Sequence, residues 1–68
     1  MKAEEVLENL IQLLLLYLEE LKDFKEVENE LFCYGERLAY TECLEVIQKW
    51  DLAKEKGLNF DIEKKYPL

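Results

Sequence analysis

The N-terminal part of the chain carries apolar residues at three- and four-residue steps, a spacing that predicts a helix over about residues 3–22. One row of this helix contains Val6, Leu10, Leu13, Leu14, Tyr17 and Leu21. Further apolar residues lie on both sides of this row and extend the apolar surface almost all the way around the helix: Leu7, Ile11, Leu15, Leu16 and Leu18. A helix that is apolar nearly all round is buried from several sides, so one partner helix cannot cover it. We therefore expect self-association, with an oligomer core of Leu10, Leu13, Leu14, Tyr17, Leu18 and Leu21.

A second helix is predicted over about residues 26–56, a stretch without proline. Its first apolar row contains Phe24, Val27, Leu31, Tyr34 and Leu38. The two helices would measure about 30 Å and about 45 Å, and arms of such unequal length leave part of the longer one for a second copy to cover. The predicted fold is all-α: residues 1–68 form a single domain, a two-helix hairpin that self-associates into a helical bundle, most simply a dimeric four-helix bundle.

One continuous helix is the alternative to the hairpin. No Gly or Pro turn separates the two predicted helices, and the three- and four-residue spacing continues across the boundary. A single long helix would form an extended two-stranded coiled coil, whose seam uses only two positions in seven. The apolar run at residues 13–18 carries more apolar surface than such a seam covers, which favours the hairpin.

The last part of the chain, residues 57–68, is expected to be a short tail packed against the end of the bundle. Gly57 can take the left-handed conformation that ends a helix, and Leu58 can then pack back on the last turn. Asp61 can cap one short turn over residues 62–65. Pro67 then prevents further helix.

Composition narrows the classes of function. The chain has 68 residues, a formal net charge of −7 and no histidine, and half of its residues are apolar. It is too apolar for disorder and too acidic to hold nucleic acid by charge, because that binding depends on Lys and Arg. The run at residues 13–18 is far shorter than the roughly 20 residues of a membrane span. The N-terminus is acidic and no cleavage-site pattern follows, so we expect a cytoplasmic protein that does not bind membranes.

The second predicted helix carries a stripe of small residues, Gly35, Ala39 and Cys43, at four-residue spacing. A glycine within a helix costs about 1 kcal/mol relative to alanine, and close approach of another helix would explain it. We expect another helix, the leucine-rich first one, to pack on this stripe; the alternative is that the stripe forms a groove for a ligand or peptide. Cys33 and Cys43 would lie about 15 Å apart on one helix, too far for a disulfide, and are expected to be reduced and mostly buried.

Four larger residues of the same helix, Tyr34, Arg37, Tyr40 and Trp50, are candidates for contact with a partner protein. Aromatic residues and arginine are the types most often found at the centre of interfaces. Trp50, beside charged neighbours near the helix end, is the best single candidate. Sequence alone does not separate this role from a place in the core.

Catalysis and metal binding have little support. The chain has no serine and no histidine, so neither cysteine has an imidazole base beside it in a catalytic pair. The carboxylates Glu36, Glu42 and Glu45 share the second helix, but the di-iron pattern of helical bundles needs histidine as well. We expect these carboxylates to form a solvated acidic face, and we expect no cofactor and no metal.

Two segments, residues 34–50 (YGERLAYTECLEVIQKW) and 57–68 (GLNFDIEKKYPL), resemble small uncharacterised helical proteins of Gram-positive bacteria. The resemblance covers the second half of the chain. It implies a bacterial cytoplasm and brings no activity, cofactor or site residue.

These patterns together predict a non-enzymatic module that forms homo-oligomers, a dimer above all, and that works as an adaptor binding another protein. One alternative is an acidic antagonist that uses its charge to occupy the basic groove of a nucleic-acid-binding protein. The other is a small-molecule sensor with an apolar pocket between its helices.

Overall fold

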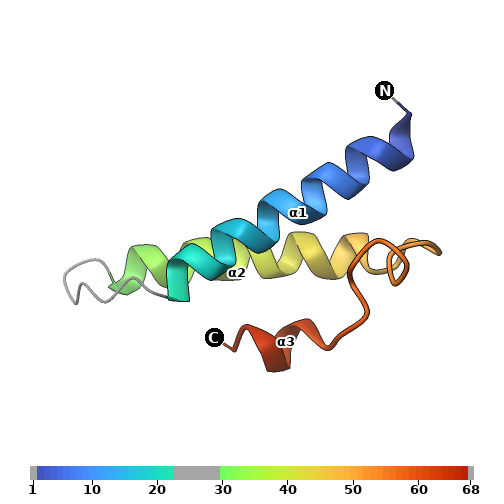
Figure 1. Cartoon of the computed structure of the whole chain (residues 1–68). Helices are drawn as coiled ribbons and strands as arrows, with labels where there is room; N and C mark the ends of the chain where they lie inside the picture. Colours follow the sequence, from blue (N-terminus) through green and yellow to red (C-terminus); the bar gives the residue numbers. More distant parts are fainter. Residues whose placement is uncertain (1, 23–29, 68) are drawn as a thin grey trace.

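The computed structural model describes residues 2–22 and 30–67 of the chain. Its helices are α1 (Ala3–Lys22), α2 (Glu30–Ile47) and the short α3 (Ile62–Lys65), and residues 2–22 and 30–67 contain no strand. Helices α1 and α2 pack side by side in opposite directions, and the tail folds back along them (Figure 1). The all-α prediction and the hairpin are confirmed, and the single continuous helix is wrong.

The core draws on all three parts of the chain. Its buried members are Ile11, Leu14 and Leu18 from α1, Leu44 and Ile47 from α2, and Ala53, Leu58, Ile62 and Tyr66 from the residues after α2. The half-buried side chains of Leu15, Tyr40, Trp50 and Phe60 pack against this cluster. The tail is therefore a structural element in its own right, because it fills the groove on one side of the hairpin.

Helix α1 begins and ends at the predicted residues, but the predicted row is not the one that the subunit buries. The buried row is Ile11, Leu14 and Leu18, whereas Leu10 and Leu13 remain about 40% exposed. Leu14 and Leu18, predicted for the oligomer core, lie in the core of the subunit instead. Because apolar residues surround the helix, periodicity could not indicate which row meets α2.

The predicted second helix is too long at its C-terminal end. Helix α2 ends at Ile47, and residues 48–57 form turns. The backbone N–H of Trp50 donates to the carbonyl of Ile47, a three-residue step that tightens the chain and turns it away from the helix axis. The turn brings Ala53 fully into the core, so tertiary packing overrides helix propensity here.

The arms of the hairpin are thus nearly equal, with 20 residues in α1 and 18 in α2. Within the described residues, neither helix therefore extends far enough past the other to leave an uncovered arm for a second copy, contrary to the expectation. The predicted start of the second helix, near residue 26, lies outside the described residues.

Gly57 behaves as predicted, although at the end of the turn segment and not of a long helix. Its φ is 114°, in the left-handed region that favours glycine. The N–H of Leu58 donates to the carbonyl of Ala53 at 2.9 Å, and that of Gly57 donates to Lys54 at 3.5 Å. These two bonds form a Schellman motif, and Leu58 then packs into the core as expected.

The predicted turn over residues 62–65 is also confirmed. Its N-cap is Asp61, whose carboxylate accepts the backbone N–H of Lys64 at 3.2 Å. The segment before it is tied to the end of α2 by the side-chain amide of Gln48, which donates to the carbonyls of Leu58 at 3.2 Å and Phe60 at 2.8 Å. These bonds hold the tail against the helical hairpin.

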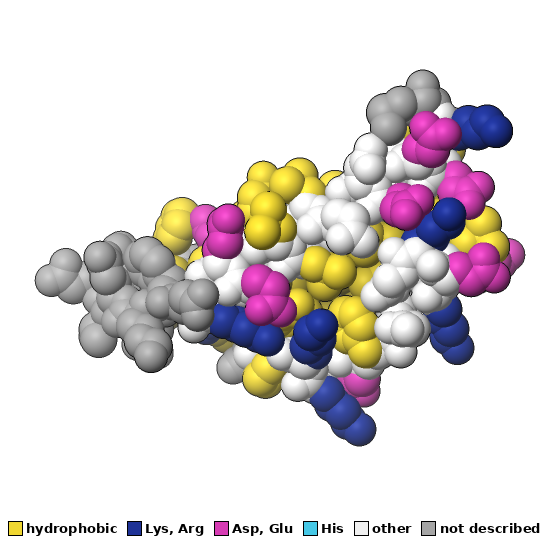
Figure 2. All heavy atoms as spheres, in the orientation of Figure 1, with side chains coloured by type: hydrophobic (Ala, Val, Ile, Leu, Met, Phe, Trp, Pro, Cys, Tyr) yellow, Lys and Arg dark blue, Asp and Glu magenta, His cyan; other side chains and the backbone are white. Residues whose placement is uncertain are grey.

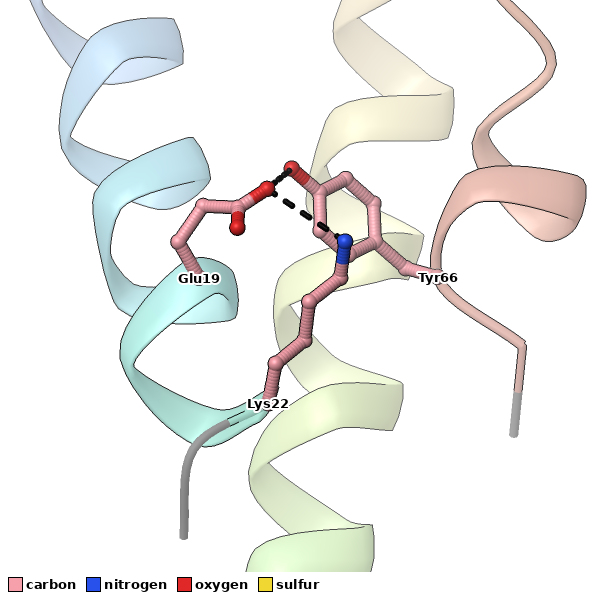
Figure 3. A network of polar contacts seen from close by, with 3 residues as sticks. All are labelled: Glu19, Lys22 and Tyr66. Atoms are coloured by element: carbon pink, nitrogen blue, oxygen red, sulfur yellow. Dashed lines mark hydrogen bonds and ion pairs between the residues drawn. The ribbon is translucent and has the colours of Figure 1, made fainter.

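A polar contact ties the far end of the tail to α1 (Figure 3). The buried Tyr66 donates its hydroxyl to Oε1 of Glu19 at 2.7 Å, and Lys22 Nζ lies 3.5 Å from the same oxygen. The hydrogen bond from Tyr66 is the largest cause that lowers the pKa of Glu19. Burial, followed by the bond to Glu19, raises the pKa of Tyr66 to about 12.

A second contact ties the turn segment to the beginning of α1. Lys56 Nζ lies 3.0 Å from Glu4 Oε1 and 3.5 Å from Glu8 Oε2, and these contacts raise the pKa of Lys56, the bond to Glu4 most of all. Acidic side chains gather over this end of α1, with basic side chains among them (Figure 2). Glu4, Glu8 and Glu19 thus mark the side of α1 that faces the tail.

None of the helices in residues 2–22 and 30–67 combines the length and the apolar character that crossing a membrane requires.

Replacing Tyr66 by phenylalanine tests the contact with Glu19. Because the pKa of Tyr66 is raised, the hydroxyl stabilises the fold fully below pH 10, and this contribution is lost as the pH rises from 10 to about 12. Y66F should lower the free energy of unfolding by about 1–2 kcal/mol at pH 7. The difference between wild type and Y66F, measured by urea denaturation, should shrink above pH 10. Y34F removes an exposed hydroxyl and is the matched control; an equal loss in Y34F would contradict the assignment.

Candidate functional site

The side of the hairpin opposite the tail is open and largely apolar. Helix α1 contributes Val6, Leu10 and Leu13, which are exposed and lie away from the glutamates that face the tail. Hydrophobic side chains are visible on the surface over the middle of α1 (Figure 2). Between α1 and the C-terminal half of α2 runs a shallow groove lined by Leu10, Glu42, Cys43, Val46 and Ile47. We call this side, with its groove, the open face.

Helix α2 contributes its small residues to the open face. Gly35, Ala39 and Cys43 are all exposed, and a Cβ added at Gly35 would have no neighbour within 4 Å. The expectation that α1 packs closely on this stripe is therefore wrong. Val46, 65% exposed, continues the apolar surface toward the end of α2. Cys43 and Val46 border the groove with Leu10, and Ala39 and Gly35 continue from Cys43 along α2 at four-residue steps.

The two cysteines differ in their surroundings. Cys33 is buried and Cys43 is exposed, and both thiols are free. The expectation that both are mostly buried holds only for Cys33, because a separation of ten positions turns the two side chains onto different faces of α2.

A separate pocket lies at the other end of the hairpin, between the C-terminal half of α1 and the N-terminal half of α2. Its volume is about 560 Å³, and it is lined by Tyr17, Glu20, Leu21, Phe32, Cys33, Glu36 and Tyr40. The rings of Tyr17 and Tyr40 are tilted against each other with their centroids 5.4 Å apart. We call this the aromatic–acidic pocket.

The charge in this pocket is negative. Each helix contributes one carboxylate, Glu20 from α1 and Glu36 from α2, and none of the described residues that line the pocket is a lysine or an arginine. The pKa of Tyr40 is raised, first by burial and then by the charges of Glu36, Tyr17 and Glu20. A cation is therefore favoured in the pocket and an anion is not.

The candidate partner contacts are spread over several surfaces. Tyr40 is half-buried between α1 and α2, and Trp50 packs against the core, so neither presents a fully exposed ring to a partner. Tyr34 is 43% exposed on α2. Arg37 is half-buried, and its buried Nε has no hydrogen-bond partner within the described part of the chain.

The residues predicted for the oligomer core likewise differ in their exposure. Leu10, Leu13 and Tyr17 are exposed, and Leu21 is half-buried. Only the exposed members remain accessible to a second chain.

The described residues contain no candidate metal site. Residues 2–22 and 30–67 contain no group of three or more acidic or cysteine side chains that could hold an ion. Glu42 is exposed and Glu45 half-buried, and both line a shallow hollow beside the tail with Leu38, Thr41, Glu63 and Tyr66.

Sequence reasoning missed two features. Glu20 interrupts the apolar spacing of α1, but the interruption does not indicate that Glu20 borders a pocket with Glu36 of α2. The bond between Glu19 and Tyr66 joins residues 47 positions apart, and no local pattern indicates it.

Comparison with protein-family models, with curated proteins and with solved structures finds no match to this chain.

The unequal burial of the cysteines can be tested by replacing each with serine. C33S replaces a buried thiol by a more strongly hydrated hydroxyl and should lower the free energy of unfolding by about 1 kcal/mol. C43S, on the exposed side of the same helix, is the matched control and should change it by less than about 0.5 kcal/mol. Urea denaturation measures both values. Equal destabilisation would contradict the orientation of α2 described above.

Proposed function

We propose that the chain is a small non-enzymatic helical module that binds protein, and that its first partner is a second copy of itself. Two hairpins would pack through their open faces into a dimeric four-helix bundle. The setting that we propose is a bacterial cytoplasm, where the free thiols of Cys33 and Cys43 stay reduced. The absence of histidine and serine supports a role without catalysis.

The exposed apolar side chains of the open face are the observation that carries this proposal. Leu10 is 40% exposed and Val46 is 65% exposed, and both border the same groove. Contiguous exposed apolar surface on a small protein marks a place where another molecule binds. A chain of 68 residues also buries a small share of its surface alone, so assembly adds stability that the single core lacks.

The shape of the open face supports a second copy as the occupant. Its α1 side carries large side chains, among them Leu10 and Leu13, and its α2 side carries the small residues Gly35, Ala39 and Cys43. A two-fold axis would bring the leucines of each copy onto the small residues of the other. The glycine that no helix of its own chain approaches would then have a packing role.

The adaptor role would use residues outside the interface between copies. Tyr34 and Arg37 lie on α2 but do not line the groove of the open face. A tyrosine and an arginine beside each other are suited to anchor a different protein. Trp50 and Tyr40 pack against the core and are not part of the surface proposed for this partner.

Substituting Leu10 tests the dimer. Wild type should sediment at twice the 8.2 kDa of the chain. L10E places a carboxylate in the groove and, because a two-fold interface carries each change twice, should weaken the dimer by at least about 100-fold. L16E alters an equally large leucine that is 53% exposed and does not line the groove, so it should remain dimeric. Sedimentation equilibrium measures all three, with circular dichroism to verify folding.

A second variant tests the interface from the α2 side. G35L fills open space in the subunit and replaces glycine by a better helix former, so the helix content should be kept or rise. The leucine should nevertheless block the close approach of the second copy and yield a folded monomer. A wild-type monomer at high concentration, or a G35L dimer as tight as wild type, would refute the proposal.

A further inference from the structure

The aromatic–acidic pocket has a chemical character that dimerisation does not require. Its walls are of two kinds: Leu21 and Phe32 provide apolar surface, and Tyr17 and Tyr40 provide adjacent aromatic rings. It is distinct from the groove of the open face, which lies toward the other end of the hairpin and shares no lining residue with it.

Among residues 2–22 and 30–67, the carboxylates of this pocket have no basic partner of the kind that other glutamates of the fold have. Glu4 and Glu8 pair with Lys56, and Glu19 pairs with Lys22. Within the described residues neither Glu20 nor Glu36 forms an ion pair, and both border the same pocket. The raised pKa of Tyr40 is consistent with two uncompensated negative charges beside it.

A positive ligand is what this environment favours. A cation over the face of a tyrosine or phenylalanine ring is attracted by the ring, and the attraction adds to that of the carboxylates. A bare divalent ion is a poor fit, because calcium takes about six to eight oxygen ligands and the pocket offers two carboxylates among apolar walls. A volume of about 560 Å³ has the size of a small-molecule site.

We propose that the pocket between Tyr17, Glu20, Phe32, Glu36 and Tyr40 binds a small organic ammonium compound with an apolar or aromatic body. The ammonium group would lie between the two carboxylates and over the tyrosine rings, and the apolar body would lie against Leu21 and Phe32. The chain would then combine protein binding at the open face with ligand binding at the other end of the hairpin.

A matched pair of probes tests the charge requirement. Phenethylammonium and 2-phenylethanol have the same aromatic body, and only the first carries a charge at pH 7. Titration of each into the full chain, followed by amide chemical shifts, should give at least about tenfold tighter binding of the ammonium probe. The largest shifts should fall at residues 17–21 and 32–40. Equal affinity for the two probes, or no binding of either, would overturn the proposal.

Matched variants test the site. E20Q/E36Q should weaken binding of phenethylammonium about tenfold, to the level of 2-phenylethanol. E5Q/E55Q removes the same charge at two exposed glutamates that line neither the pocket nor the groove, and should bind like wild type; an equal loss in this pair would show general charge attraction only and overturn the site. Repeating the titration with L10E separates this proposal from the dimer, because the pocket should bind the probe equally in a chain that does not self-associate.

Discussion

The packing of the tail into the hairpin groove is the interaction on which the rest of the structure depends. Two helices alone cannot enclose α1, whose apolar residues surround it. Leu58, Ile62 and Tyr66 supply the third side, and all three are almost fully buried. Because the tail covers the groove on one side of the hairpin, the opposite side is the one that remains exposed. The position of the candidate interface therefore follows from where the tail packs.

Local signals in the sequence predicted the parts of the fold that local chemistry decides. The bounds of α1, the left-handed glycine at residue 57 and the short helix capped by Asp61 all follow from propensity and capping. These features need no knowledge of distant residues. The same reasoning placed the tail against the helices, because its apolar residues require burial.

The remaining features depend on contacts between distant residues, which periodicity cannot indicate. The end of α2 at Ile47 follows from the need to bring Ala53 and Leu58 into the core, although the sequence continues with good helix formers. Which row of α1 is buried depends on the packing angle of α2 and on the tail. The aromatic–acidic pocket is lined by residues of two helices. In the sequence, the residues that each helix contributes look like part of an ordinary amphipathic helix, so neither set indicates a pocket.

The bond between Tyr66 and Glu19 has a consequence for how the protein is made. Its partners are 47 residues apart, and the tail that carries Tyr66 also completes the core. A ribosome adds about 5–20 residues per second, so α1 and α2 emerge seconds before Tyr66 is free to join them. During that interval the nascent hairpin presents its leucines on both sides to chaperones and to neighbouring chains. Core closure consequently waits until the tail has left the exit tunnel, after both long helices have emerged.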